Sequence, residues 1–141
     1  GCPWLADDLA DAALEDPLFR RHLTGSVLVP VPLHARRRRE RGYNQAERIA
    51  DFLARRLPGC ATAALLRKQT ETLSQTRLDR QERRANVRRA FRLAEGAKVD
   101  PDRRYVVVDD VLTTGATLHA CAATLRAAGA SHVDAAALAH G

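Results

Sequence analysis

A short apolar run ends in two adjacent acids and is followed at once by hydroxyl side chains and a glycine, in the stretch YVVVDDVLTTGAT at 105–117. Residues 105–110 have the composition of a buried strand, and 115–129 predict a helix. In open α/β sheets, ligands bind beyond the carboxyl ends of the strands. Asp109 and Asp110 stand at that end, where two carboxylates can accept hydrogen bonds from a vicinal diol such as that of a ribose.

The turn between the predicted strand and helix has the composition of an anion site. The first N–H groups of a helix have no partner within the helix, and the helix dipole favours an anion there. Glycine lets the backbone approach a phosphate closely, and threonine hydroxyls add donors. The candidate phosphate-binding residues are Thr113, Thr114, Gly115, Ala116 and Thr117. Acids followed by this turn predict a ribose 5-phosphate site; the alternative is that Asp110 and a threonine only cap the helix.

A run of arginines follows a second apolar segment. The segment SVLVPVPLH at 26–34 predicts a strand bounded by prolines, and RRRRERGYNQ at 36–45 predicts a charged loop with its turn at Gly42. Guanidinium groups pair bidentately with pyrophosphate oxygens. A solvated surface loop and a nucleic-acid patch are the alternatives for this run. Asn44 is expected to cap the helix that follows.

The other segments indicate how these residues are positioned. Strand and helix patterns alternate, which favours an α/β fold with a mainly parallel, twisted sheet flanked by helices. We expect a single domain over 1–141, opened by an N-terminal helical segment at 1–25. The predicted elements are one or two helices over 4–23, an amphipathic helix over 43–57, a strand over 61–68, a loop over 94–104 and a last strand over 132–140.

The segment 69–92 differs from the rest because it is polar, rich in arginine and poor in large apolar side chains. Two interpretations compete here, a surface helix over 79–90 and a flexible basic flap.

Composition limits the possible functions. The 141 residues are 45% hydrophobic and 28% charged, which is typical of a globular domain, and the net charge of +6 favours anionic partners. No apolar run is long enough to span a bilayer, so we expect a cytoplasmic protein. Three cysteines, Cys2, Cys60 and Cys121, lie far apart and form neither a zinc motif nor an obvious disulfide framework.

Two resemblances cover about residues 27–140. The stretch VVVDDVLTTGAT closely resembles the phosphoribosyl pyrophosphate (PRPP) signature of type I phosphoribosyltransferases. The segments VPVPLHARRRRERGYNQAERIADFLA at 29–54 and TLSQTRLDRQERRANVRRAF at 72–91 resemble the ComF family of competence-associated, phosphoribosyltransferase-like proteins. Members of that family usually begin with a cysteine-rich zinc-binding segment, which this sequence does not contain.

The resemblance implies roles for named residues. Asp109 and Asp110 would hold the ribose of PRPP, and Leu33, His34, Ala35 and Arg36 would hold its pyrophosphate. Gln75 and Arg77 would reach phosphates from a mobile flap or hood over 69–92. Mg²⁺ would bind with the pyrophosphate, with Asp109 and Asp110 as candidate contacts, and the phosphoribosyl group would pass to a nitrogen nucleophile.

The resemblance also implies partners and leaves the acceptor open. The expected ligand is PRPP or ribose 5-phosphate, and a homodimer is plausible for this fold. The competence family acts in DNA uptake, so the alternatives are a protein associated with single-stranded DNA and a PRPP-sensing scaffold that meets a helicase without catalysing transfer.

Overall fold

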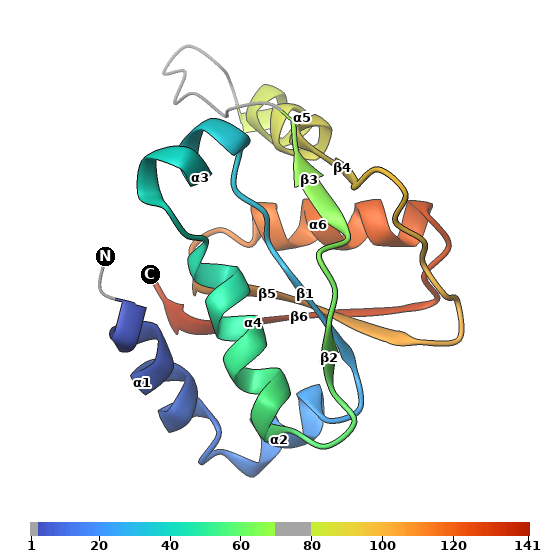
Figure 1. The fold of residues 1–141 in the computed structure, drawn as a ribbon. Helices are drawn as coiled ribbons and strands as arrows, with labels where there is room; N and C mark the ends of the chain where they lie inside the picture. The colour runs from blue at the N-terminus through green and yellow to red at the C-terminus, as the bar shows by residue number, and fades with distance from the viewer. Residues whose placement is uncertain (1–2, 70–79) are drawn as a thin grey trace.

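The computed structural model describes residues 3–69 and 80–141, with strands and helices in alternation (Figure 1). The elements are α1 (Pro3–Ala13), α2 (Pro17–Leu23), β1 (Val27–Pro30), α3 (Ala35–Arg41), α4 (Gln45–Arg56), β2 (Ala61–Thr62), β3 (Leu66–Lys68), α5 (Arg80–Ala90), β4 (Phe91–Leu93), β5 (Arg104–Leu112), α6 (Ala116–Ala127) and β6 (His132–His140).

The central sheet has four parallel strands in the order β2-β1-β5-β6. Strand β5 pairs with β1 from Val27↔Tyr105 to Pro30↔Val108, and with β6 from Arg104↔His132 to Leu112↔His140. Helices α1 and α4 pack on one face and α6 on the other (Figure 1). The predicted α/β class with a parallel, helix-flanked sheet is confirmed.

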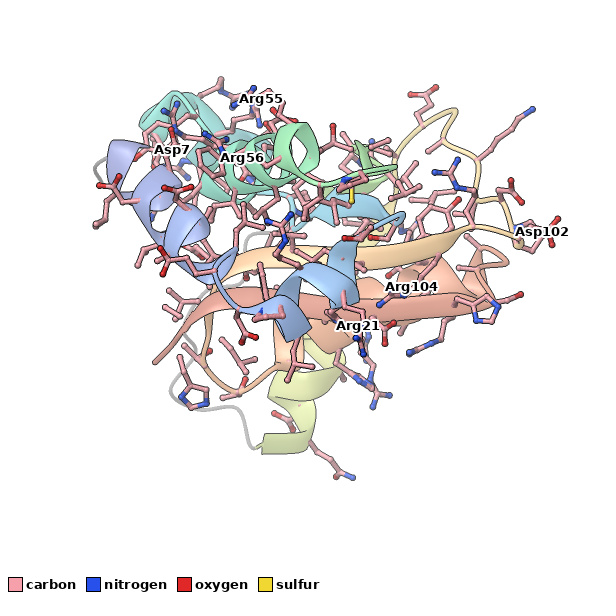
Figure 2. The ribbon with its side chains drawn as sticks, turned by 90° about the horizontal axis from the view of Figure 1, so that it is seen from below. Asp7, Arg21, Arg55, Arg56, Asp102 and Arg104 are labelled. Carbon is pink, nitrogen blue, oxygen red and sulfur yellow. The ribbon has the colours of Figure 1, made fainter. Side chains whose placement is uncertain are left out.

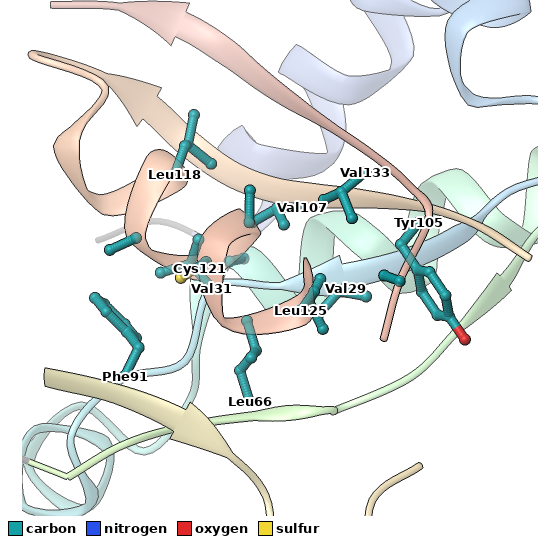
Figure 3. Packing of buried hydrophobic residues seen from close by; sticks show 14 of the residues in the cluster. Val29, Val31, Leu66, Phe91, Tyr105, Val107, Leu118, Cys121, Leu125 and Val133 are labelled. Carbon is teal, nitrogen blue, oxygen red and sulfur yellow. The ribbon is translucent and has the colours of Figure 1, made fainter. Parts of the chain in front are cut away.

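The face under α6 holds one of two apolar clusters. Val29 and Val107 of the sheet pack against Leu118 and Leu125 of α6, and Phe91 of β4 closes the cluster (Figure 3). Alternate residues of a strand point to opposite faces, so Val106 and Val108 lie in the other cluster, under α1 and α4. Burial on both faces explains the unbroken VVV run of β5.

The N-terminal helices are fixed to the other face by apolar and ionic contacts. Asp16 caps α2 by accepting from the Leu18 N–H at 2.9 Å. Asp7 of α1 pairs with Arg48 of α4 at 3.0 Å, and Asp11 of α1 pairs with Arg56 of α4 at 4.0 Å. Figure 2 shows Asp7 and Arg56 on the same side of the molecule, where α1 and α4 run together.

Two sequence-based expectations were wrong in detail. The run 36–45 was expected to be a charged loop, but Ala35–Arg41 is helix α3, because His34 caps its start, arginine favours helix and Gly42 ends it at a φ of 77°. The single strand expected over 61–68 is split into β2 and β3, which belong to different sheets. Ala63 N–H still donates to Leu28 O at 3.0 Å, but the chain then leaves the central sheet.

A small antiparallel sheet, β3–β4, stands beside the central one. The sequence predicted a strand in the region of β3 but none at β4. Lys68 pairs with Phe91, and helix α5 lies directly before β4 in the chain. The surface-helix interpretation of 79–90 is therefore correct for residues 80–90. Within the residues described, no helix has both the length and the apolar content to cross a membrane.

Candidate functional site

The two acids lie where β5 leaves the buried part of the sheet. Val106, Val107 and Val108 are buried, whereas Asp109 and Asp110 are half-buried. Asp109 Oδ1 accepts from the Asp110 N–H at 2.8 Å, and Asp110 Oδ1 accepts from the Val111 N–H at 2.9 Å. Each carboxylate thus uses one oxygen on the backbone and is held at the carboxyl edge of the sheet, as the sequence predicted.

The Asp109 carboxyl has an unusual protonation equilibrium. Burial raises its pKa from 3.8 to about 7, and the hydrogen bond and charge of Asp110 push in the same direction. The Asp110 backbone N–H and the Lys68 ammonium oppose the rise. A carboxyl that ionises near neutral pH at a sheet edge is a mark of a functional site.

Lys68 is a candidate site residue that the sequence analysis missed. It is the last residue of β3, and its ammonium is near enough to lower the pKa of Asp109. Its backbone forms a parallel bridge with His34, and its Nζ lies 5.7 Å from the centroid of the Phe91 ring. A single lysine in a short strand has no sequence pattern that marks it as functional. Its position near the two acids depends on the backbone bridge between Lys68 and His34.

The turn after β5 has the geometry of an anion-binding loop. Gly115 is the N-cap of α6 at a φ of 81°, a conformation that favours glycine, and no side chain caps the helix at this residue. Thr114 Oγ1 accepts from the Ala116 N–H at 3.2 Å, and the Thr113 side chain is exposed. The capping alternative therefore holds only for Thr114, and the acids play no part in it.

The loop after β1 brings a second set of polar groups to the same edge. His34 Nδ1 accepts from the Arg36 N–H at 3.2 Å, so in the neutral ring the proton is on Nε2, which can act as a donor. Leu33 is half-buried, whereas Ala35 and Arg36 are exposed in the first turn of α3. Figure 1 shows α3 and the start of α6 at the same end of the sheet.

The arginines of α3 differ in their contacts. Arg38 pairs with Glu47 of α4 at 2.7 Å, which fixes α3 to the rest of the fold, and Arg36 lies 3.5 Å from Glu40. The side chains of Arg37 and Arg39 are exposed. Arg38 is thus a structural contact rather than a group ready for a ligand.

The residues present fit a metal that arrives with its ligand. No cluster of three or more His, Cys, Asp or Glu suited to a metal exists among the residues described, so the chain offers no complete protein site there. Two adjacent carboxylates fit Mg²⁺, which proteins commonly bind through one or two carboxylates plus substrate phosphates. Gln75, Arg77 and Cys2 lie outside the described residues, and so do residues 70–79 of the expected flap.

Comparisons with known proteins agree with this geometry. Residues 44–141 match the family described as "Phosphoribosyl transferase domain". The chain is 37% identical over 108 residues to competence protein F of Haemophilus influenzae, which covers 77% of this chain and 47% of that protein. It is 36% identical over 135 residues to the DNA utilization protein YhgH of Salmonella typhi, covering 92% of this chain and 58% of the relative. The chain thus spans about half the length of these relatives.

Solved structures with little sequence identity share the fold. A purine phosphoribosyltransferase from Pyrococcus horikoshii superposes with a TM-score of 0.51 at 19% identity, over 97% of this chain and 74% of that one. A hypoxanthine phosphoribosyltransferase from Staphylococcus aureus gives 0.52 at 8% identity, over 94% and 61%. These likenesses concern the arrangement of strands and helices.

Proposed function

Because the chain belongs to the phosphoribosyl transferase domain family, and within it to the ComF group of competence and DNA utilization proteins, we propose that it binds PRPP and transfers the phosphoribosyl group to a nitrogen nucleophile. One observation carries the proposal. The half-buried carboxyl of Asp109 is close enough to the Lys68 ammonium to feel its charge, and helix α6 begins after Gly115, six residues further along the chain. That arrangement offers separate places for a diol, a 5-phosphate and a diphosphate.

The 5-phosphate end of PRPP would bind at the start of α6. The backbone N–H groups that follow Gly115 have no helical acceptor, and the dipole of the 12-residue helix favours an anion there. The hydroxyls of Thr113 and Thr117 add donors. The carboxylate oxygens of Asp109 and Asp110 would accept from the two ribose hydroxyls.

The pyrophosphate end would lie across the sheet edge, toward β3 and α3. Lys68 supplies an ammonium close to Asp109, and His34 supplies the Nε2–H donor. Arg36, in the first turn of α3, can reach the same oxygens. This places positive charge at the leaving group and negative charge at the ribose, which matches the charge that develops as the bond breaks.

The transfer itself needs no protein nucleophile. The bond from C1 of the ribose to the pyrophosphate oxygen breaks with its electron pair going to the pyrophosphate, and the nitrogen lone pair forms the new bond to C1. The nitrogen then loses a proton to solvent. Mg²⁺, when bound with the ligand, would neutralise the leaving pyrophosphate. Asp109 and Asp110 would stabilise the positive charge on the ribose in the transition state.

Titration calorimetry with PRPP, in the presence and absence of Mg²⁺, tests the proposal. Wild-type protein should bind with Mg²⁺, and the double variant Asp109→Asn, Asp110→Asn should lose that binding while unfolding cooperatively. A matched control is Asp100→Asn plus Asp102→Asn, which removes two acids from an exposed turn. Equal affinity in the site variant and the control would refute the site assignment.

A second candidate function is contact with single-stranded DNA, which the exposed arginines of α3 favour. Arg37 and Arg39 are solvent-exposed on α3, whereas Arg38 of the same helix is held by Glu47. If DNA binds here, replacing Arg37 and Arg39 by Gln should weaken binding. The slope of log affinity against log salt concentration should fall by the amount expected for about two phosphate contacts.

A protein that binds PRPP but catalyses no measurable transfer would instead favour the PRPP-sensing scaffold.

A further inference from the structure

Asn44 is a buried side chain that uses both ends of its amide. Only 4% of the residue is exposed. Its Oδ1 accepts from the Ala46 N–H at 2.9 Å and so caps α4, as the sequence predicted. Its Nδ2 donates to the Val31 carbonyl at 3.0 Å, a contact across 13 residues that the sequence did not indicate. The second bond ties the start of α4 to Val31, the residue directly after β1.

The Val31 carbonyl is the group at which the β1–β5 ladder stops. Val31 N–H still donates to Val108 O at 2.9 Å, next to the last registered pair, Pro30↔Val108. In a parallel ladder, the same register would pair the Val31 carbonyl with the N–H of Asp110. This backbone bond is not formed; instead, the Val31 carbonyl and the Asp110 N–H each bond to a side chain.

Each of the two groups that the ladder leaves unpaired has its own side-chain partner. The Val31 carbonyl accepts from the Asn44 amide, and the Asp110 N–H donates to Asp109 Oδ1 at 2.8 Å. No buried backbone group is lost when the strands part, so the opening carries little penalty from unmade hydrogen bonds.

We propose that Asn44 is a positioning residue that holds the end of β1 away from β5 and thereby sets the spacing between the 31–36 loop and the two acids. This inference rests on the proposed function, because it assigns the pyrophosphate end of the ligand to that loop. From Val31 the chain reaches His34 in three residues, and His34 is fixed by its bridge to Lys68 and its cap on α3. Both ends of the short loop are therefore anchored, one of them by Asn44.

Two variants separate the donor of Asn44 from its acceptor. Asn44→Ser and Asn44→Asp both retain an oxygen that caps α4, since serine and aspartate are good N-caps, but neither presents an amide N–H to Val31. Asp16→Ser is the matched control, because it changes the cap of α2, a helix that supplies none of the proposed site residues. Its effect measures what an altered helix cap does to the fold as a whole.

The first measurement compares two ligands that use different ends of the site. With Mg²⁺ present, both Asn44 variants should bind inorganic pyrophosphate about tenfold more weakly, as expected when one positioning hydrogen bond is lost. Their affinity for ribose 5-phosphate, which uses only 109–117, should stay within about twofold of wild type. Equal losses for both ligands, or no loss for either, would overturn the inference.

The second measurement needs no ligand. If Asn44 keeps the strands apart, its loss lets the Asp110 N–H pair with the Val31 carbonyl, and hydrogen exchange at the Asp110 amide should slow relative to wild type and to Asp16→Ser. Unchanged or faster exchange at this amide would refute the positioning role. A wild-type protein that binds neither ligand would refute the proposed function instead, and the exchange result would still decide the role of Asn44.

Discussion

Replacing Asp109 by Asn is expected to stabilise the folded protein at neutral and basic pH, although it removes a proposed ligand contact. The folded environment raises the pKa of this carboxyl from 3.8 to about 7, mainly by burial. Above pH 7 the wild type must keep a charge where burial disfavours it. An Asn side chain has no charge to desolvate, and its amide oxygen can still accept from the Asp110 N–H as Asp109 Oδ1 does at 2.8 Å.

The sign and size of the effect follow from linkage between folding and protonation. Because the folded pKa lies above the unfolded one, wild-type stability is highest below pH 4 for this group and falls as pH rises through about 7. A shift of about 3 pKa units corresponds to about 4 kcal/mol. The carboxyl is only half-buried, and solvent screening reduces this to about 2 kcal/mol. For a chain of this size, that is a rise in Tm of about 4–8 °C.

Thermal unfolding of the wild type and Asp109→Asn at pH 8 and pH 5 measures the effect. The variant should unfold at the higher temperature at pH 8, and its advantage should shrink at pH 5, where much of the penalty on the wild type is relieved by protonation. Asp102→Asn, at an exposed turn, controls for removal of one negative charge from a basic chain. A variant less stable than wild type at pH 8, or an advantage that does not depend on pH, would show that burial does not penalise the Asp109 charge.

Three further outcomes follow from the same contacts. Because Asp109 ionises at about pH 7, affinity for Mg²⁺ and PRPP in calorimetry should increase between pH 6 and pH 8, and a flat profile would mean that ligand binding does not need its carboxylate. Lys68→Met should weaken pyrophosphate binding about tenfold or more and shift that pH profile upward, since an opposing charge is removed, whereas Arg92→Met on the neighbouring strand should change neither. Gly115→Ala should lower the free energy of unfolding by about 1 kcal/mol in urea titrations, because alanine is strained at a φ of 81°, and equal stability would argue against a rigid turn.

The sequence predicted the parts of the fold that local patterns determine. The unbroken apolar run of β5, the amphipathic period of α4 and the paired acids before Gly115 each depend on neighbours within a few residues, and each was placed correctly. The arginine run was interpreted as a loop because its charge suggested solvent. A short helix was possible there because His34 and Gly42 cap it, and Glu47 binds one of its arginines.

The parts that were missed depend on contacts between distant segments. The division of 61–68 between two sheets is set by where β1 and β4 lie, and nothing local marks the break. Lys68 becomes a site residue only through its bridge with His34. The raised pKa of Asp109 likewise arises from the packing around the strand end, which the sequence does not state.

The identity of residue 44 is explained only when both of its contacts are considered. Serine, threonine, aspartate and asparagine all make good N-caps, so capping alone does not select among them. Asparagine is the one whose side chain has both an amide donor and a carbonyl acceptor, and here the two point to different elements, the Ala46 N–H of α4 and the Val31 carbonyl beyond β1. Aspartate would place a carboxylate against that carbonyl, and serine is too short to span both partners. The choice of asparagine therefore matches the two groups that its side chain meets where β1 and β5 part.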